Sequence, residues 1–155
     1  AVLRYMLYGC KTNLVSLDQE IQHLKNYVAL NRLQIEDRAQ IKFTETIQCM
    51  DYTIRPLVLI VFVENAFKHS SGSMSQGIVV DIHIEVSENG TLNFLCHNNY
   101  SPKYLPQGSD SGIGLANVQK RLALQYPDQH RLDIRDKGNS FSVNLMIKLH
   151  KAGEQ

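Results

Sequence analysis

Pro56-Leu-Val-Leu-Ile-Val-Phe-Val-Glu-Asn-Ala-Phe-Lys-His69 is the most distinctive stretch of this chain. Proline suits a first helical position and the stretch has no glycine, so it predicts a helix from Pro56 to His69. Its first half is apolar around the whole circumference, which is typical of a helix buried in a core. At 100° per residue, Asn65, Lys68 and His69 then share one helix face. Three polar side chains are therefore expected on one face of a buried helix.

Two interpretations of this polar face are open. The helix could simply reach the surface there, with Glu64 and Lys68 forming an i, i+4 pair worth about 0.2–0.5 kcal/mol. The face could instead bind a hard cation and an anion, because an asparagine oxygen can ligate Mg²⁺ and a lysine ammonium can lie beside phosphate. A second element of the sequence bears on this choice.

That element is Ser111-Gly-Ile-Gly-Leu115, at the start of a helix predicted over Ile113–Gln125. Glycines let the backbone approach a ligand, and the unpaired N–H groups at a helix N-terminus attract phosphate oxygens. A simple entry turn would use the same glycines. The pattern GxxxxGK[ST] and the third glycine of a dinucleotide fingerprint are both absent, which excludes P-loop and Rossmann sites.

Asn98 is a third candidate site residue. It follows the alternating residues Leu92, Phe94 and Cys96, where the strand is expected to give way to a loop from Asn98 to Ser111. A side-chain amide can both donate and accept, as recognition of an adenine edge requires. Turn formation is the alternative role for this asparagine.

The rest of the chain alternates between helical and strand periodicity. Ser16 and Gln19 form a capping box, which predicts a helix from there to about Glu36. Residues of alternating or β-branched character predict further strands, with reversals at Asn89-Gly90 and Lys137-Gly138-Asn139. These strands are expected at Ile41–Ile47, Ile78–Val86, Thr91–Cys96, Arg131–Asp136 and Ser140–Leu149.

Composition bounds the class of protein. The chain has 155 residues, 43% hydrophobic and 20% charged, which favours one compact domain. A net charge of +1 provides no broad field for nucleic acid or anionic lipid. Cys10, Cys49 and Cys96 form no CxxC pair and fit reduced thiols. The apolar run Leu57–Val63 is far below the roughly 18 residues of a membrane span, and the start of the chain looks excised from a longer protein.

Two motifs carry a resemblance to a known family. They are Glu64-Asn-Ala-Phe-Lys-His69 and Gly112-Ile-Gly-Leu-Ala-Asn-Val-Gln-Lys-Arg-Leu122. In this order they resemble the ATP-binding catalytic domain of bacterial sensor histidine kinases, and more narrowly the subfamily of autolysis-regulating sensors. The resemblance implies an α+β fold of the Bergerat type, a two-layer α/β sandwich in which a mixed sheet carries about three helices on one face. ATP is then expected between the asparagine helix and the glycine segment.

The resemblance also implies how the chain is organised. Residues 1–15 would be the end of a dimerisation and phosphoacceptor hairpin, 16–150 the ATP-binding catalytic domain, and 151–155 a polar tail. The parent protein would form a homodimer through the hairpin, act on a response regulator, and be a membrane-anchored bacterial sensor. This segment would be part of its cytoplasmic portion, with no nucleic acid partner and no direct membrane contact.

The resemblance further implies roles for the site residues, with ATP and Mg²⁺ as ligands. Asn65 matches the Mg²⁺ ligand, and Lys68 and His69 match positions near the phosphates. Glu64, the third residue expected to act in catalysis beside Asn65 and Lys68, would pair with Lys68 or orient the site. Asn98 would contact adenine, and Asn99 to Ser111 would form a lid. The phosphate-binding segment would consist of Gly112, Ile113, Gly114 and Leu115.

Three departures qualify the resemblance. The chain has Asn98-Asn99-Tyr100 where the family has D-x-G. Val61 occupies the position where ATP-hydrolysing relatives place a glutamate base, so transfer is favoured over hydrolysis. No histidine lies in the family's I-N-P-H-F-x-x-N context, so the chain alone is not expected to phosphorylate itself. Two alternatives stay open: a nucleotide-binding regulatory module without transfer, and a serine kinase of the anti-sigma type.

Overall fold

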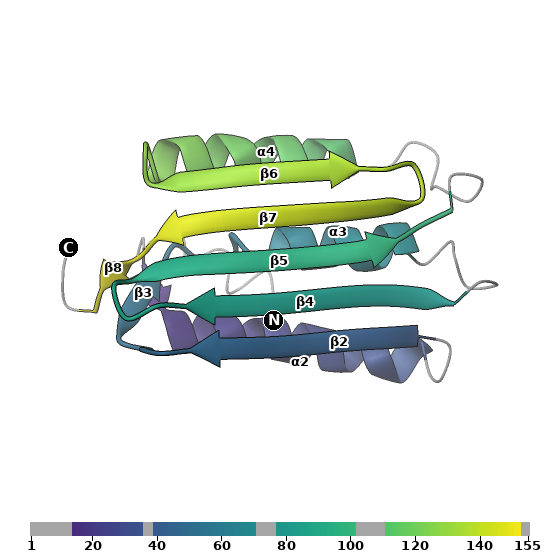
Figure 1. Ribbon diagram of the computed structural model, residues 1–155, viewed down its shortest axis with the longest axis horizontal. Coiled ribbons are helices and arrows are strands. Elements are labelled where there is room, and N and C mark those ends of the chain that lie inside the picture. Colours follow the sequence, from purple (N-terminus) through teal and green to yellow (C-terminus); the bar gives the residue numbers. More distant parts are fainter. Residues whose placement is uncertain (1–13, 36–38, 71–76, 102–110, 153–155) are drawn as a thin grey trace.

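A five-stranded mixed sheet forms one layer and helices form the other (Figure 1). The computed structural model describes residues 14–35, 39–70, 77–101 and 111–152. Among these residues, three helices cover one face of the sheet: α2 (Leu17–Ile35), α3 (Ile60–Ser70) and α4 (Ser111–Gln125). The strands are β2 (Ala39–Ile47), β4 (Ile78–Val86), β5 (Thr91–Asn99), β6 (His130–Asp136) and β7 (Ser140–Lys148). The predicted α+β class, with its helices on one face, is confirmed.

The sheet order is β2-β4-β5-β7-β6. Only β2 and β4 run parallel among these neighbours, and the other pairs are antiparallel. A smaller sheet, missed by the sequence analysis, joins β1 (Val15–Ser16), β3 (Tyr52–Ile54) and β8 (His150–Lys151). Strands of two or three residues are too short to show a periodicity. Lys151, expected in a polar tail, therefore pairs with Tyr52 instead.

Helix α2 begins where the capping box predicts. The Ser16 hydroxyl accepts a hydrogen bond from the Gln19 amide at 3.1 Å, and the helix starts at Leu17. Its buried residues recur at helical spacing and face the sheet: Leu17, Glu20, Ile21, Leu24 and Val28. The predicted end at Glu36 and the predicted helical remnant at residues 1–8 lie outside the described residues.

Helix α3 begins four residues later than predicted. The chain turns at residues 56–59 and becomes helical at Ile60. Leu57 has φ of 63°, in the left-handed region, so a right-handed helix cannot pass through it. The Leu57 amide donates instead to the carboxylate Oε1 of buried Glu20, at 3.0 Å. Pro56 thus lies in a turn held by tertiary contacts and does not occupy the first helical position.

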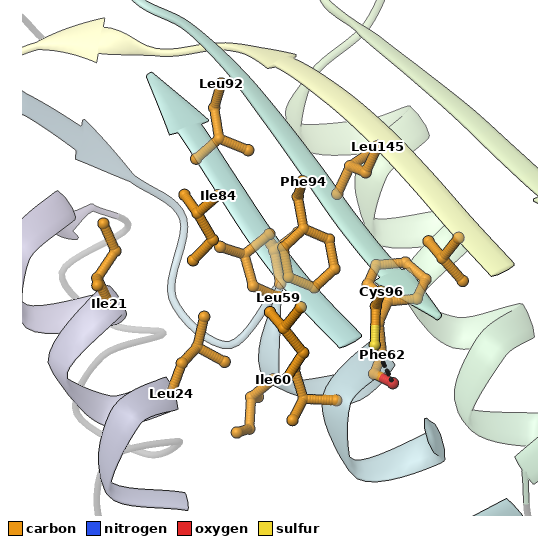
Figure 2. Packing of buried hydrophobic residues seen from close by; sticks show 14 of the residues in the cluster. Ile21, Leu24, Leu59, Ile60, Phe62, Ile84, Leu92, Phe94, Cys96 and Leu145 are labelled. Carbon is orange, nitrogen blue, oxygen red and sulfur yellow. Dashed lines mark hydrogen bonds between the residues drawn. The ribbon is translucent and has the colours of Figure 1, made fainter. Parts of the chain in front are cut away.

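The core lies between the sheet and the helices. Alternate residues of β4, β5 and β7 are buried on the face that the helices cover, as their period of two predicts. Figure 2 shows side chains of the sheet pointing toward those of α2 and α3, with Phe94 near Phe62. Their ring centroids lie 6.1 Å apart. No helix in the described ranges is long and apolar enough to span a bilayer.

The two described cysteines form no disulfide. Cys96 is buried in this core and its thiol contacts the carbonyl oxygen of Phe62 at 3.7 Å. Burial raises the pKa of Cys96 to about 12, so the thiol stays protonated and unreactive near neutral pH. It serves as a small core residue, while Cys10 lies outside the described residues.

Replacement of Gly90, in the turn between β4 and β5, is expected to destabilise the fold. Its φ is +88°, and an added Cβ would lie 2.7 Å from Cε1 of Tyr52. We expect Gly90→Ala to lower the free energy of unfolding by about 2–4 kcal/mol, because backbone strain and overpacking add. Gly138→Ala is the matched control, since its φ is +87° but nothing lies within 4 Å of the added methyl. Urea unfolding that gave equal losses for the two variants would contradict the steric part of this explanation.

Candidate functional site

Helices α3 and α4 run antiparallel, which brings the two sequence motifs to one end of the molecule. A Cβ added to Gly114 would lie 4.0 Å from Cγ1 of Val61. Further along α4, Arg121 reaches back to the carbonyl oxygen of Pro56 at 2.6 Å. The N-terminus of α4 therefore points toward the C-terminal half of α3, where Asn65 follows Val61 by one turn.

Asn65 is buried with an unpaired acceptor. The residue is 7% exposed, and its Oδ1 has no hydrogen-bond partner among the described residues. A buried acceptor without a partner costs about 1–3 kcal/mol, so proteins rarely retain one without a ligand or a water for it. An amide oxygen is a suitable ligand for a hard cation such as Mg²⁺. The position of Asn65 thus fits the metal-binding role that the motif predicts.

The described residues contain no group of three or more His, Cys, Asp and Glu side chains that could hold a metal ion. Mg²⁺ commonly keeps several waters and binds through few protein ligands together with substrate phosphates. A single amide oxygen at Asn65 is compatible with that mode of binding.

Asn98 lies inside β5 and not in the predicted loop, because β5 continues to Asn99. It is 1% exposed and pairs with Val80 and Phe141, so the turn-forming role considered above is wrong. The side chain follows Leu92, Phe94 and Cys96 on the face toward the helices. Its Nδ2 donates to the Asn99 carbonyl at 3.0 Å.

Asn99 has a structural role that the sequence analysis missed. Its Oδ1 accepts from the Val79 amide and its Nδ2 donates to the Gly77 carbonyl, each at 2.9 Å. These bonds fasten the start of β4 to the end of β5, so Asn99 is not the first residue of a lid. Asparagine side chains often bind the backbone in turns. A segment that begins with two asparagines was therefore predicted to be a loop from its composition. The remainder of the predicted lid, residues 102–110, lies outside the described residues.

His69 lies over the same end of the sheet. Its ring centroid is 5.9 Å from that of Phe141 and 6.3 Å from that of Tyr100. Burial, and then the charge of Lys68, lowers the pKa of His69, while Asp136 and the Asn65 carbonyl oppose this shift. The neutral ring is therefore favoured at neutral pH. Since Phe141 pairs with Asn98, the structure brings His69 and Asn98 to neighbouring positions.

Lys68 and Glu64 occupy exposed positions of α3. Partial burial raises the pKa of Glu64. The pKa of Tyr27 in α2 is raised mainly by burial and further by the charge of Glu64. Tyr27 itself packs edge-on against Phe67, with ring centroids 5.9 Å apart. Glu64 is thus within electrostatic reach of α2.

A contact near the end of β5 was not predicted. The Tyr100 hydroxyl donates to Oδ1 of Asp136, which also accepts from the Gly138 amide at 2.9 Å. The hydrogen bond from Tyr100 is the main cause of a lowered pKa for Asp136. The Tyr100 amide donates to the Asn139 carbonyl at 3.0 Å. The chain leaving β5 is therefore held to the β6–β7 turn. In the sequence, the only sign that Tyr100 is unusual is that it stands where the family's D-x-G pattern has glycine.

The glycine segment forms the first turn of α4. The helix starts at Ser111, so the backbone amides of Gly112, Ile113 and Gly114 belong to the turn whose N–H groups lack intrahelical acceptors. The segment predicted to supply amide donors thus occupies a helix N-terminus, two residues earlier than the helix start predicted at Ile113. Leu115 is half-buried and packs against the core.

Comparisons with known proteins show what this chain is similar to. No protein-family model matches the chain. An alignment of 162 positions that covers 98% of this chain shows 25% identity to the sensor protein LytS of Staphylococcus saprophyticus. An alignment of 151 positions that covers 89% of this chain shows 24% identity to the sensor protein kinase HptS of Staphylococcus aureus. The aligned parts make up 27% and 28% of these relatives, so the chain spans about a quarter of their length.

The solved structures show the same fold. The catalytic domain of the histidine kinase ThkA superposes with a TM-score of 0.57 at 15% identity, covering 87% of this chain and 93% of that domain. At this identity the likeness establishes the arrangement of helices and strands. The chain is therefore similar in sequence to sensor histidine kinases over nearly its whole length, and it has the fold of a histidine kinase catalytic domain.

Proposed function

We propose that this chain is the ATP-binding catalytic domain of a two-component sensor histidine kinase. Its reaction would transfer the γ-phosphoryl group of ATP to a histidine on an upstream hairpin of the parent protein. One observation carries the proposal: the unpaired, buried Oδ1 of Asn65 and the N-terminus of α4 lie at the same end of two antiparallel helices. A metal ligand and a set of phosphate-binding amides are thereby available to one triphosphate.

Each site residue receives a role from its position. Asn65 would hold Mg²⁺, which neutralises charge between the β- and γ-phosphates when bound. Lys68, exposed one turn after Glu64, would lie beside the phosphates as a cation, with Glu64 orienting it. Neutral His69 would offer a ring nitrogen to a phosphate oxygen or its water. The backbone amides of the first turn of α4, from Gly112 to Leu115, would bind phosphate oxygens.

Asn98 would recognise the base. It is buried at the end of the sheet nearest His69, where its amide can donate to and accept from an adenine edge. An asparagine in place of the family's aspartate loses the charge but keeps an acceptor oxygen, and it adds an NH₂ donor. The geometry therefore favours retained adenine recognition at Asn98.

In phosphoryl transfer the protein mainly positions the reactants and offsets charge. A nitrogen of the acceptor imidazole would form a bond to the γ-phosphorus as the bond to the β–γ bridging oxygen breaks, so that ADP leaves with that oxygen. The phosphorylated ring then loses its proton to water. Val61 lies one turn before Asn65 and presents no group that could activate water. The site is therefore suited to transfer to a histidine and poorly suited to ATP hydrolysis.

The partners follow from the same proposal. The parent would be a dimeric sensor that passes the phosphoryl group to a response regulator, with this domain in the cytoplasmic portion of a membrane-anchored protein. Its acceptor histidine would lie outside this sequence, since none of the six histidines here has the expected context. Phosphorylation in solution would thus require a separately supplied hairpin.

Calorimetric titration of the chain with a non-hydrolysable ATP analogue tests the proposal. We expect binding that is at least about 10-fold tighter with Mg²⁺ than without it, equivalent to about 1.4 kcal/mol. In Asn65→Ala this metal dependence should disappear, whereas in Asn98→Ala binding should weaken with and without Mg²⁺. Asn144→Ala is the matched control, because Asn144 is exposed and alternates along β7 with buried residues that face the helices. Absence of nucleotide binding, or phosphoserine formed on a partner, would overturn the proposed function.

A further inference from the structure

We infer that Arg121 is a positioning residue, which fixes the phosphate-binding end of α4 relative to the helix that carries Asn65. The inference rests on the proposed function and extends it to a residue outside the site. Arg121 belongs to the second sequence motif, but the sequence analysis gave it no role. It lies about two helical turns beyond Gly114, too far along α4 to belong to the N-terminal turn.

The contacts of Arg121 lead to the turn before α3. Its Nη2 donates to the Pro56 carbonyl at 2.6 Å, and its Nη1 donates to the Leu57 carbonyl at 3.4 Å. A guanidinium that binds two consecutive carbonyls from a half-buried position is a directional anchor, since its donors form a rigid planar fork. The anchor joins α4 to a distant part of the chain, since Leu57 and Pro56 lie 64 and 65 residues before Arg121.

The same short turn is held from two other directions. The Leu57 amide donates to Glu20 of α2 at 3.0 Å, and the Arg55 amide donates to the Tyr126 hydroxyl at 2.9 Å. Glu20 and Tyr126 are both fully buried. Residues Arg55 to Leu57 are therefore fixed to α2 and to the C-terminal end of α4, and α3 starts from a constrained point at Ile60.

This geometry links the turn to the nucleotide site. Asn65 lies in the same short helix, and the first turn of α4 lies alongside it. Groups that act on one ligand must hold their relative positions to within about 0.5 Å, because looser placement sacrifices binding and rate. The bond from Arg121 to the turn constrains the sliding of α4 along α3. Its loss should therefore affect the phosphate-binding amides of α4, while Asn98, which belongs to β5, should keep its position.

Three variants of the full chain test this inference: Arg121→Met, Arg121→Lys and, as matched control, Arg131→Met. Arg131 is exposed in β6. Isothermal calorimetry compares Mg²⁺-ATP, which needs the phosphate contacts, with adenosine, which needs the base contact, and thermal unfolding is recorded for each variant. We expect Arg121→Met to weaken ATP binding about 10-fold and adenosine binding by less than about 2-fold. Arg121→Lys should recover part of the ATP affinity, since lysine can donate to one carbonyl, and the control should bind both ligands normally.

If Arg121 only stabilised the fold, the variants would show a different pattern of ATP and adenosine binding. Equal weakening of ATP and adenosine binding, or a lowered melting temperature with unchanged ATP binding, would overturn the role of Arg121. If the methionine variant does not fold, the lysine variant decides, because it must still lose affinity for ATP more than for adenosine. Wild-type protein that binds no ATP would instead overturn the proposed function, and the positioning role with it.

Discussion

Replacing Asn65 by alanine should slow phosphoryl transfer to a separately supplied phosphoacceptor hairpin by about 10²–10³-fold, the usual cost of removing one preorganised electrostatic group. Oδ1 of Asn65 has no partner among the described residues, so its removal sacrifices no hydrogen bond that the structure records for that atom. The fold should therefore tolerate the change, and the free energy of unfolding should stay within about 1 kcal/mol of wild type. Single-turnover transfer from labelled ATP and urea unfolding of the same preparations measure both quantities.

The combination of outcomes is what tests the assignment. Near-wild-type transfer by Asn65→Ala would refute Asn65 as the metal ligand. A large loss of stability alongside the loss of transfer would show that the amide is a structural group. Asn144→Ala again serves as the control, because it removes an exposed amide from the face of β7 opposite the buried one and should leave both quantities unchanged.

Phe94→Ala should lower the free energy of unfolding by about 3–5 kcal/mol. Phe94 lies in the middle of β5, is 1% exposed, and points into the layer between sheet and helices beside Phe62 (Figure 2). Removing the ring loses its transfer free energy and leaves a cavity that close-packed neighbours can only partly fill. Because small domains have about 5–15 kcal/mol of total stability, this variant should be only marginally folded at physiological temperature.

Denaturant unfolding of Phe94→Ala, with Phe94→Leu as the conservative partner, measures the effect. The leucine variant keeps most of the buried volume and should lose clearly less stability. Leu124→Ala is the surface control, since Leu124 is 81% exposed and its truncation should change the free energy of unfolding by no more than about 0.5 kcal/mol. A loss below about 1.5 kcal/mol for Phe94→Ala would show that the core around it can collapse.

Long periodic elements were predictable because their signal is local. The capping box placed the start of α2 within one residue, and the β-branched, apolar stretch Ile78–Val86 gave the extent of β4. Short strands carried no such signal. Tyr52–Ile54 pairs with Val15–Ser16 and with His150–Lys151, so its conformation depends on partners distant in the chain.

The candidate site was predictable in its residue types and not in its surroundings. The order of the two motifs predicted which side chains and amides could act on a nucleotide. The position of Asn98 within a strand and the anchoring of β4 by Asn99 were not predicted, because asparagine is more common in turns than in strands. Composition therefore placed the end of β5 too early.

By itself, the sequence determined the approximate extent of the helices and of the long strands, because these depend on side-chain periodicity within one segment. The α+β class followed from the resemblance that the two motifs carry. Only the tertiary structure decided that α3 begins at Ile60, since the turn before it is held by Glu20 and Arg121 from distant segments. Likewise, only the packing of α4 against α3 decided that Gly114 lies near Val61 and that Asn65 is buried with an unpaired oxygen. Such contacts are set by how whole elements pack, and no local pattern of residues encodes them.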